Sequence, residues 1–322
     1  MDSNPLFPPS STREEESPRI AMSHSSTTDI VLHIGFHKTG SSALQNYLFS
    51  QGNFSRPYDT IFPTCTWLNN ADLAWVCIGR RFEWQDRDYN LEDVASHYRS
   101  AVERSIARNR RTVISSEEFC RLNEHYHQSF FVRLGKALPI DNVKVLAYIR
   151  DPLDFLVSRY CHEVLYSESR SFEDFVSGEI STSDFCIRLK PWLDFFGPDR
   201  AIIREFKGGD FSIVDDFNDQ FGVPGIATAS ETFVHRRIGA GANFAIAEAL
   251  ALINASVKEQ KLRETLRNRL LALEFRALAK TEVRAAALDA LANSVKDELG
   301  LLAQRQQDYL LPRGNPTPLQ TG

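Results

Sequence analysis

The chain has 322 residues, 43% of them hydrophobic, and a net charge of −5 with a sequence pI near 5.9. These values allow one large domain or two with a real core, and they argue against broad nucleic-acid binding, which needs a basic surface. No apolar run approaches the ~18–20 residues of a membrane span, and no secretory signal is visible. Five scattered cysteines without a CxxC pair favour reduced thiols over disulfides or a zinc site. We therefore expect a cytoplasmic protein, and we expect residues 1–28, rich in Ser, Pro and Glu, to be a disordered tail.

A candidate phosphate-binding element follows this tail. The apolar run Ile30–Ile34 predicts a buried parallel strand. It is followed by a short loop with Gly35, Lys38 and Gly40, and then by an apparent helix from Ser41. A strand, a glycine loop and a helix bind phosphate through backbone N–H groups and the positive end of the helix dipole. The sequence therefore predicts a phosphate-bearing ligand here.

The order of residues in this loop differs from that of a nucleotide kinase. The Walker pattern places lysine after the second glycine, whereas Lys38 precedes Gly40 here. The pattern from Gly35 to Gln45 resembles the 5′-phosphosulfate loop of PAPS-dependent sulfotransferases of the bacterial type (PAPS is 3′-phosphoadenosine 5′-phosphosulfate). The resemblance implies a set of donor-binding residues in this loop: His37, Lys38, Thr39, Gly40, Ser41 and Ser42. It also implies that Lys38 stabilises the charge on the leaving phosphate.

The next part of the chain has a weaker pattern. We expect residues 52–89 to be an irregular segment; they are dense in aromatic residues, which either stack on an acceptor or pack in the core. Residues Asn90–Asn109 are predicted to form a helix, because four apolar residues recur on one face. These are Val94, Tyr98, Val102 and Ile106.

A carboxylate pair follows the next predicted strand, Thr112–Ser115. In open parallel sheets, ligands bind beyond the carboxyl ends of the strands. In related sulfotransferases the residue at the end of the corresponding strand is the catalytic base, which must reach the acceptor proton. We expect Glu117 to be that base, with Glu118 second and His125 and His127 as substitutes. Acidic residues at this point could instead stabilise the start of the following helix.

A second anion-binding motif follows the predicted strand Val143–Ile149. Arg150 comes directly after the strand, Pro152 suits the first turn of a helix, and Ser158 falls about two turns into it. The segment resembles the 3′-phosphate-binding element of the sulfotransferases, which implies that Arg150 and Ser158 bind the 3′-phosphate of PAPS. The guanidinium fork suits a phosphate. The alternative is a surface arginine paired with a neighbouring aspartate.

The later elements are predicted from caps and periodicity. A capping box at Ser171 opens a short helix; Asp184–Phe196 is a helix, Arg200–Phe206 a strand and Ile213–Phe221 a helix. The segment from Val234 to Leu250 resembles the family's donor lid, an arginine-rich loop followed by a helix. By this resemblance Arg236 or Arg237 would add positive charge at the 3′-phosphate, and we take Arg237. A plain solvated loop is the alternative.

The C-terminal part, residues 245–306, consists almost entirely of good helix formers. We expect two or three helices, with breaks near Ser256 and Thr281, that form a packed appendage or a dimerisation element. The predicted division is a sulfotransferase domain at 29–255, a helical extension at 256–311 and a disordered tail at 312–322.

Together these features predict a three-layer α/β/α fold around a mostly parallel sheet, like that of the P-loop nucleotide hydrolases, with a C-terminal helical extension. The resemblance implies in-line transfer of a sulfuryl group from PAPS to an acceptor hydroxyl, on a carbohydrate or a glycolipid, without a metal. The expected partners are this acceptor and, through the C-terminal helices, a second copy of the chain. Two alternatives remain: an ATP-dependent P-loop kinase, and an inactive binding protein of the same fold.

Overall fold

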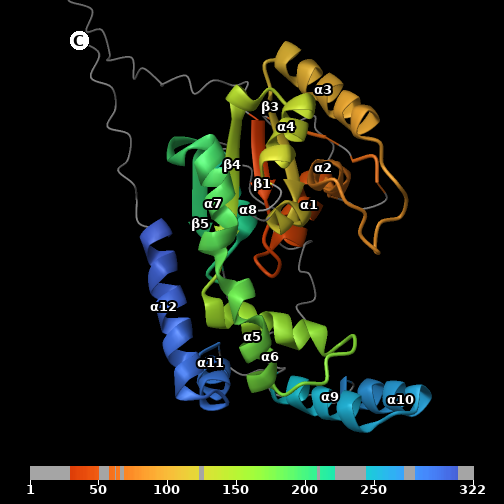
Figure 1. Cartoon of the computed structure of the whole chain (residues 1–322), viewed down its shortest axis with the longest axis vertical. Helices are drawn as coiled ribbons and strands as arrows, with labels where there is room; N and C mark the ends of the chain where they lie inside the picture. The colour runs from red at the N-terminus through yellow and green to blue at the C-terminus, as the bar shows by residue number, and fades with distance from the viewer. Residues whose placement is uncertain are drawn as a thin grey trace, which may run out of the picture.

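A parallel β-sheet of five strands forms the centre of the protein (Figure 1). The computed structural model describes residues 30–50, 58–61, 63–65, 69–122, 127–208, 211–221, 244–271 and 280–310. The strand order is β2-β3-β1-β4-β5, and every neighbouring pair is parallel. All five carboxyl ends therefore lie at one edge of the sheet. The strands are β1 (Ile30–Ile34), β2 (Tyr58–Thr60), β3 (Arg111–Ser116), β4 (Val143–Ile149) and β5 (Ala201–Glu205).

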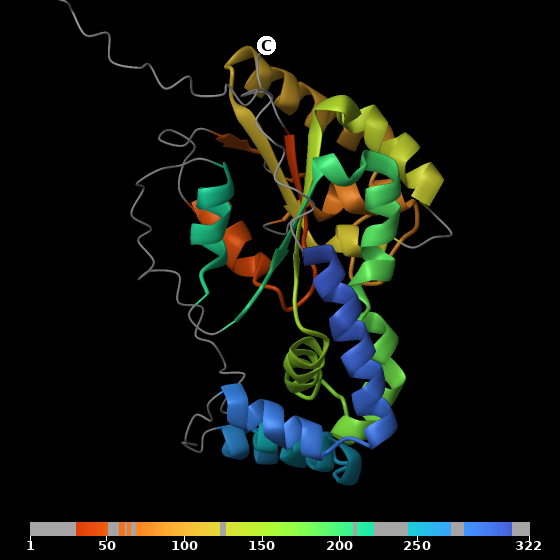
Figure 2. The same ribbon diagram turned by 90° about the vertical axis from the view of Figure 1, so that its left-hand side faces the viewer.

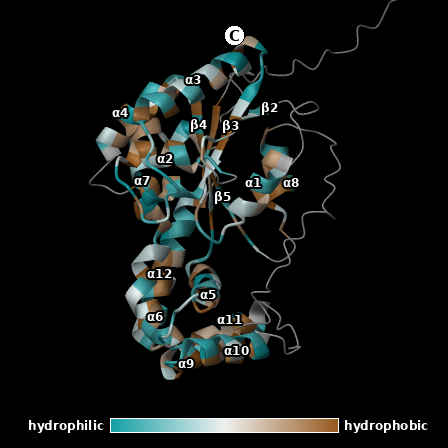
Figure 3. Ribbon diagram, turned by 90° about the vertical axis from the view of Figure 1, so that its right-hand side faces the viewer, coloured by the Kyte–Doolittle hydropathy of each residue, from teal (hydrophilic) through white to brown (hydrophobic). Residues whose placement is uncertain are grey.

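Helices cover both faces of the sheet, which confirms the predicted three-layer fold (Figures 2 and 3). Strand β1 is completely buried and alternates between two cores: Ile30, Leu32 and Ile34 face the larger, and Val31 faces the smaller. Helices α1 (Ser41–Ser50) and α8 (Ile213–Phe221) cover the smaller core. The larger core lies under α2 (Ala71–Ile78), α3 (Leu91–Ala107), α4 (His127–Ala137) and α7 (Phe185–Phe196).

Local caps define several of the helices that sequence analysis predicts. The Asn90 side chain accepts hydrogen bonds from the backbone N–H groups of Glu92 and Asp93 at the start of α3. Ser171 caps α6 (Phe172–Glu179), and Asp184 caps α7 rather than belonging to it. Helix α5 (Pro152–Glu163) begins at the predicted proline. Among the described residues there are also four short 3-10 helices: η2 (Glu117–Arg121), η3 (Ile140–Asn142), η4 (Ile180–Ser183) and η5 (Pro198–Arg200).

The expectation of an irregular segment at residues 52–89 is wrong in part. The structure places strand β2 and helix α2 there. All eight residues of α2 are buried, so the helix has no polar face and no amphipathic period. Its position depends on long-range contacts: the Asn70 side chain accepts from the backbone N–H of Ser115, and Tyr98 donates to Asp72. Of the aromatic residues in this segment, Trp75 and Phe82 pack in the core.

Four helices, rather than two or three, occupy the described C-terminal residues: α9 (Phe244–Ser256), α10 (Gln260–Leu271), α11 (Lys280–Asp289) and α12 (Asn293–Leu310). The predicted break at Ser256 is confirmed. The break predicted near Thr281 agrees with the start of α11 at Lys280, and residues 272–279 before it lie outside the described part. Helices α11 and α12 share the larger core with the sheet, and α12 runs along α5, α7 and β5. The domain boundaries stay predictions. No helix of the described residues is long and apolar enough to cross a membrane.

Candidate active site

Hydrogen bonds within the loop between β1 and α1 stabilise its conformation. Lys38 (φ 62°) and Gly40 (φ 83°) both have left-handed backbone conformations, which turn the chain sharply before α1 begins. The Thr39 hydroxyl donates to the carbonyl of Phe36 (2.7 Å), and the Ser41 hydroxyl donates to the same oxygen (3.2 Å). These two hydroxyls stabilise the loop. The exposed Ser42 is the predicted serine whose hydroxyl remains accessible to a ligand.

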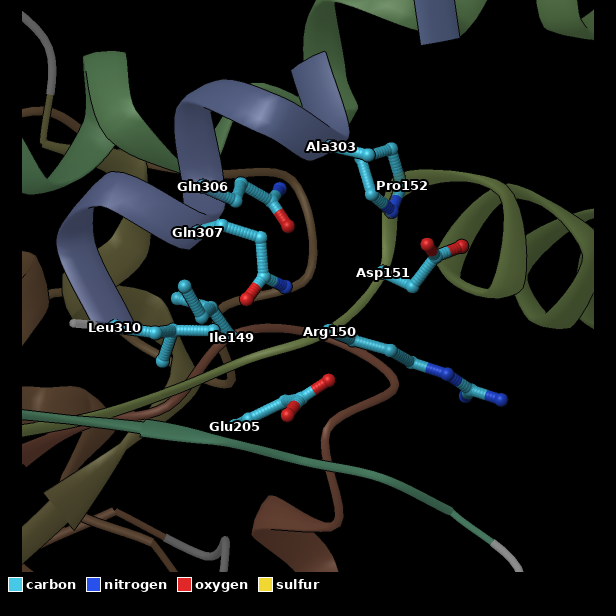
Figure 4. Close-up of a pocket in the computed structure, with 9 residues that line it drawn as sticks. All are labelled: Ile149, Arg150, Asp151, Pro152, Glu205, Ala303, Gln306, Gln307 and Leu310. Carbon is cyan, nitrogen blue, oxygen red and sulfur yellow. The ribbon is translucent and has the colours of Figure 1, made fainter. Parts of the chain in front are cut away.

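The two predicted anion-binding motifs meet at this loop. Arg150 Nη1 donates to the backbone carbonyl of Lys38 at 3.0 Å, across 112 positions of sequence. In Figure 4, the Arg150 side chain extends from the turn between β4 and α5, away from α12. Burial, together with the neighbouring Arg150 charge, lowers the pKa of Lys38. The two cations are thus close enough to repel each other, and an anion bound between them would relieve that repulsion.

Ser158 lies on α5, which begins two residues after Arg150. Burial raises the pKa of the Cys161 thiol to about 12, while the positive charges of Lys38 and Arg150 act in the opposite direction. Cys161 therefore lies near both cations. Ser158 precedes Cys161 by three positions on α5, and residues at that spacing share one helix face. Ser158 is half-buried and lies on the same side of α5 as Cys161. Arg237, with the rest of the predicted lid, lies outside the described residues.

The two glutamates after β3 have different environments. Glu118 is buried, accepts a hydrogen bond from Trp75 Nε1 (3.0 Å) and pairs with Arg121 (3.0 Å). It therefore stabilises the fold, and its position does not suit a base. Glu117 is half-buried, and its Oε2 accepts from Gln45 Nε2 of α1 at 2.7 Å. The residue before it, Ser116, pairs with the phosphate loop through its carbonyl, which accepts from Gly35 N–H (3.1 Å).

The structure describes neither side chain of the two histidines predicted as substitute bases. His125 lies outside the described residues. His127 is the first residue of α4, and its side chain is also outside the described part. No group of three or more His, Cys, Asp or Glu residues that could hold a metal ion occurs among the residues that the structure describes.

A cavity of about 690 Å³ opens beside the loop, and sequence analysis did not predict it. Its walls come from the loop, the segments after α2 and β3, helix α5, and the η4–α7 region. Lys38 lines it, whereas Arg150 and Ser158 do not. His37 also lines it: burial, with the charges of Arg121 and Arg188, lowers its pKa to about 3, so this imidazole is neutral at pH 7. The loop thus has a 3′-phosphate candidate site on one side and an open cavity on another.

Comparison with known proteins gives one family. No curated protein matches the chain. The family model described as "Sulfotransferase domain" matches residues 27–206, more than half of the 322 residues. The match begins just before β1 and ends just after β5, so it contains the whole sheet, the phosphate loop and the turn that bears Arg150. Because this model covers more than half of the chain, the chain belongs to the sulfotransferase family, whose chemistry is sulfuryl transfer.

Proposed function

We propose that the protein transfers the sulfuryl group of PAPS to an acceptor hydroxyl. The observation that carries this proposal is the contact between Arg150 and Lys38. PAPS bears negative charge at two places, the 5′-phosphosulfate and the 3′-phosphate. Two cationic motifs that meet at one loop can bind both ends of such a molecule, because each anionic group then has its own donors.

The donor end is bound as follows. The backbone N–H groups from Thr39 to Ser42, at the N-terminus of α1, bind the 5′-phosphate. The Lys38 ammonium stabilises the charge that builds on the bridging oxygen as the S–O bond breaks. Arg150 and Ser158 bind the 3′-phosphate, with Arg237 as a further cation, so that ATP binds poorly. Lysine and the helix N-terminus supply the positive charge for the donor, and the proposal therefore includes no metal.

The acceptor approaches from the cavity. Its hydroxyl oxygen attacks sulfur in line with the leaving oxygen, a new O–S bond forms, and the product 3′,5′-adenosine bisphosphate leaves with the electrons of the broken bond. Glu117 takes the proton of the attacking hydroxyl. His37 lies nearer the cavity, but a group with a pKa of about 3 is a poor base at neutral pH. We propose a carbohydrate or glycolipid as the acceptor.

Calorimetry separates this function from the kinase alternative. Wild-type protein should bind 3′,5′-adenosine bisphosphate, and ATP with Mg²⁺ only weakly. Arg150→Ala should weaken bisphosphate binding about 10- to 100-fold, since a hydrogen bond to a charged group contributes ~1.5–3 kcal/mol, with little effect on ATP. Lys261→Ala, an exposed lysine of α10, is the matched control and should change nothing. Tight, magnesium-dependent ATP binding that is insensitive to Arg150→Ala would contradict the proposal.

Product analysis separates it from the alternative of an inactive binding protein. Wild-type protein with PAPS and a panel of glycans should give products heavier by one sulfuryl group. Lys38→Ala should give none, although it should keep its fold. Bisphosphate binding without any sulfated product would favour the inactive binding protein.

A further inference from the structure

The cavity beside the phosphate loop has an excess of positive charge. Among the residues that the structure describes, two carboxylates line it, and both are paired: Asp184 with Arg305 at 2.5 Å, and Glu163 with Arg159 at 3.8 Å. The cations that line it are more numerous: Lys38, Arg80, Arg121, Arg159 and Arg188. A cavity with this lining attracts anions and repels cations.

Not all of these cations are available to a ligand. Arg121 pairs with the buried Glu118, and Arg159 pairs with Glu179 at 2.9 Å. Within the described residues, neither Arg80 nor Arg188 forms an ion pair with a carboxylate. Arg188 is half-buried on α7, where an unneutralised guanidinium costs more free energy than on an open surface. This cost is recovered when an anion binds.

Aromatic rings fix the positions of two of the arginines. The Arg80 guanidinium lies 4.6 Å from the centre of the Phe82 ring, and that of Arg121 lies 4.6 Å from the centre of the Trp84 ring. Phe82 and Trp84 stack on each other, with ring centres 4.8 Å apart. Arginines stacked in this way lose less conformational freedom when a ligand binds. They form a preorganised edge to the cavity.

The field of these cations reaches the loop. Burial lowers the pKa of His37 first, and the positive charges of Arg121, Arg188, Arg159 and Lys38 lower it further. A neutral acceptor would leave this field uncompensated when it displaces water from the cavity. An acceptor with a negative group would compensate it.

We propose that the acceptor is itself an anion: a hydroxyl compound that carries a carboxylate, sulfate or phosphate group, which Arg188 and Arg80 bind while the hydroxyl faces Lys38. The inference rests on the proposed sulfuryl transfer and names its substrate class. The volume of about 690 Å³ lies within the ~300–1,000 Å³ of ordinary small-molecule sites. The negative group does not react. It orients the acceptor, so its loss should raise KM more than it lowers kcat.

The test uses acceptor pairs that differ only in charge. Chondroitin without sulfate is compared with its carboxyl-reduced form, which keeps the hydroxyls and loses the carboxylates; glucose 1-phosphate is compared with methyl glucoside. The chondroitin pair tests a carboxylate, and the glucose 1-phosphate pair tests a phosphate, so the comparison shows which of the two anionic groups the site binds. We expect kcat/KM to be at least about tenfold higher for the acidic member of one pair. Equal or better use of the neutral members, or no preference in either pair, would overturn the inference.

Variants locate the effect. Arg188→Gln should lower kcat/KM for the acidic acceptor about 10- to 100-fold, mainly through KM, and should leave the neutral acceptor unchanged. The control is Lys190→Gln, two positions further along α7, where an exposed lysine pairs with Asp194 and does not line the cavity. It should behave as wild type. An equal effect of Arg188→Gln on both members of a pair would overturn the assignment.

Donor binding separates the two proposals. Arg188→Gln should bind 3′,5′-adenosine bisphosphate as wild type does, which also shows that it folds. If wild-type protein binds the bisphosphate and sulfates only neutral acceptors, the acidic-acceptor inference alone fails. If it neither binds the bisphosphate nor sulfates any acceptor, the proposed function fails, and this inference with it.

Discussion

Helix α11 should control the affinity of the donor site through one arginine. Arg284 contacts the two aspartates at the start of α5: Asp151 at 2.6 and 3.2 Å, and Asp154 at 2.9 Å. Asp151 directly follows Arg150, so its charge lies beside the proposed 3′-phosphate site. The pair is partly exposed, since the side chains of Arg284 and Asp151 are 40% and 27% exposed. Arg284→Gln should therefore cost about 1–2 kcal/mol of folding stability, less than a fully buried pair.

The effect on the donor follows from Coulomb's law. Without Arg284, the charge of Asp151 is no longer neutralised and repels a phosphate bound at Arg150. With the two charges roughly 8 Å apart and an effective dielectric constant between about 20 and 80, the repulsion is about 0.5–2 kcal/mol. The affinity for 3′,5′-adenosine bisphosphate should fall about 2- to 30-fold, and the loss should shrink at high salt because salt screens exposed charges.

The assay is calorimetry with this bisphosphate at low and high salt, alongside urea unfolding. Arg305→Gln is the matched control: Arg305 joins α12 to the buried carboxylate of Asp184, which caps α7. Its loss should reduce stability by a similar amount without changing donor affinity. If Arg284→Gln and Arg305→Gln bind the bisphosphate equally well, Arg284 does not act on the donor site, and the reasoning is refuted.

Three further predictions concern the loop, its base and its stability. Gly35→Ala should weaken bisphosphate binding at least about tenfold, because a Cβ at this position would lie 2.4 Å from the Ser41 hydroxyl oxygen of α1. The control Gly300→Ala, in open space on α12, should keep wild-type affinity and raise the free energy of unfolding in urea by ~0.5–1 kcal/mol. Equal bisphosphate affinity of the two variants would contradict this prediction. Glu117→Gln should lower kcat about 10²- to 10⁴-fold in a sulfation assay and leave bisphosphate affinity unchanged; near-normal turnover would exclude it as the base. Burial lowers the pKa of His33 to about 3 from an ordinary 6.5. The unfolded chain therefore takes up a proton that the folded one does not, so stability falls as pH drops below 6.5, by about 2 kcal/mol at pH 5. His33→Gln should remove this part of the pH dependence, and an unchanged dependence would show that another group causes it.

Several elements could be predicted from local sequence because their signals are local. Strands β1 and β4 have the predicted bounds, since a buried parallel strand is a continuous apolar run between breakers. The caps at Asn90 and Ser171 mark helix starts for a similar reason: each satisfies backbone N–H groups two or three residues away.

Other elements had no local signal. Helix α2 is buried on all sides, so its sequence has no helical period, and β2 has only three residues at the edge of the sheet. The position of α11 depends on tertiary contacts, including the packing of Val283 and Ala287 in the larger core. Intrinsic preference is a weak guide where packing decides.

By itself, the sequence determined the parallel strands, the glycine-containing loop before α1 and the place of the arginine after β4, because each depends on residues adjacent in the chain. Only the tertiary structure distinguished Glu117 from Glu118, since their partners, Gln45 and Trp75, come from two different helices. It likewise created the cationic cavity, whose arginines come from four separate segments. A charge that acts across space has no signature along the chain, and it exists as a site only once packing has brought those segments together.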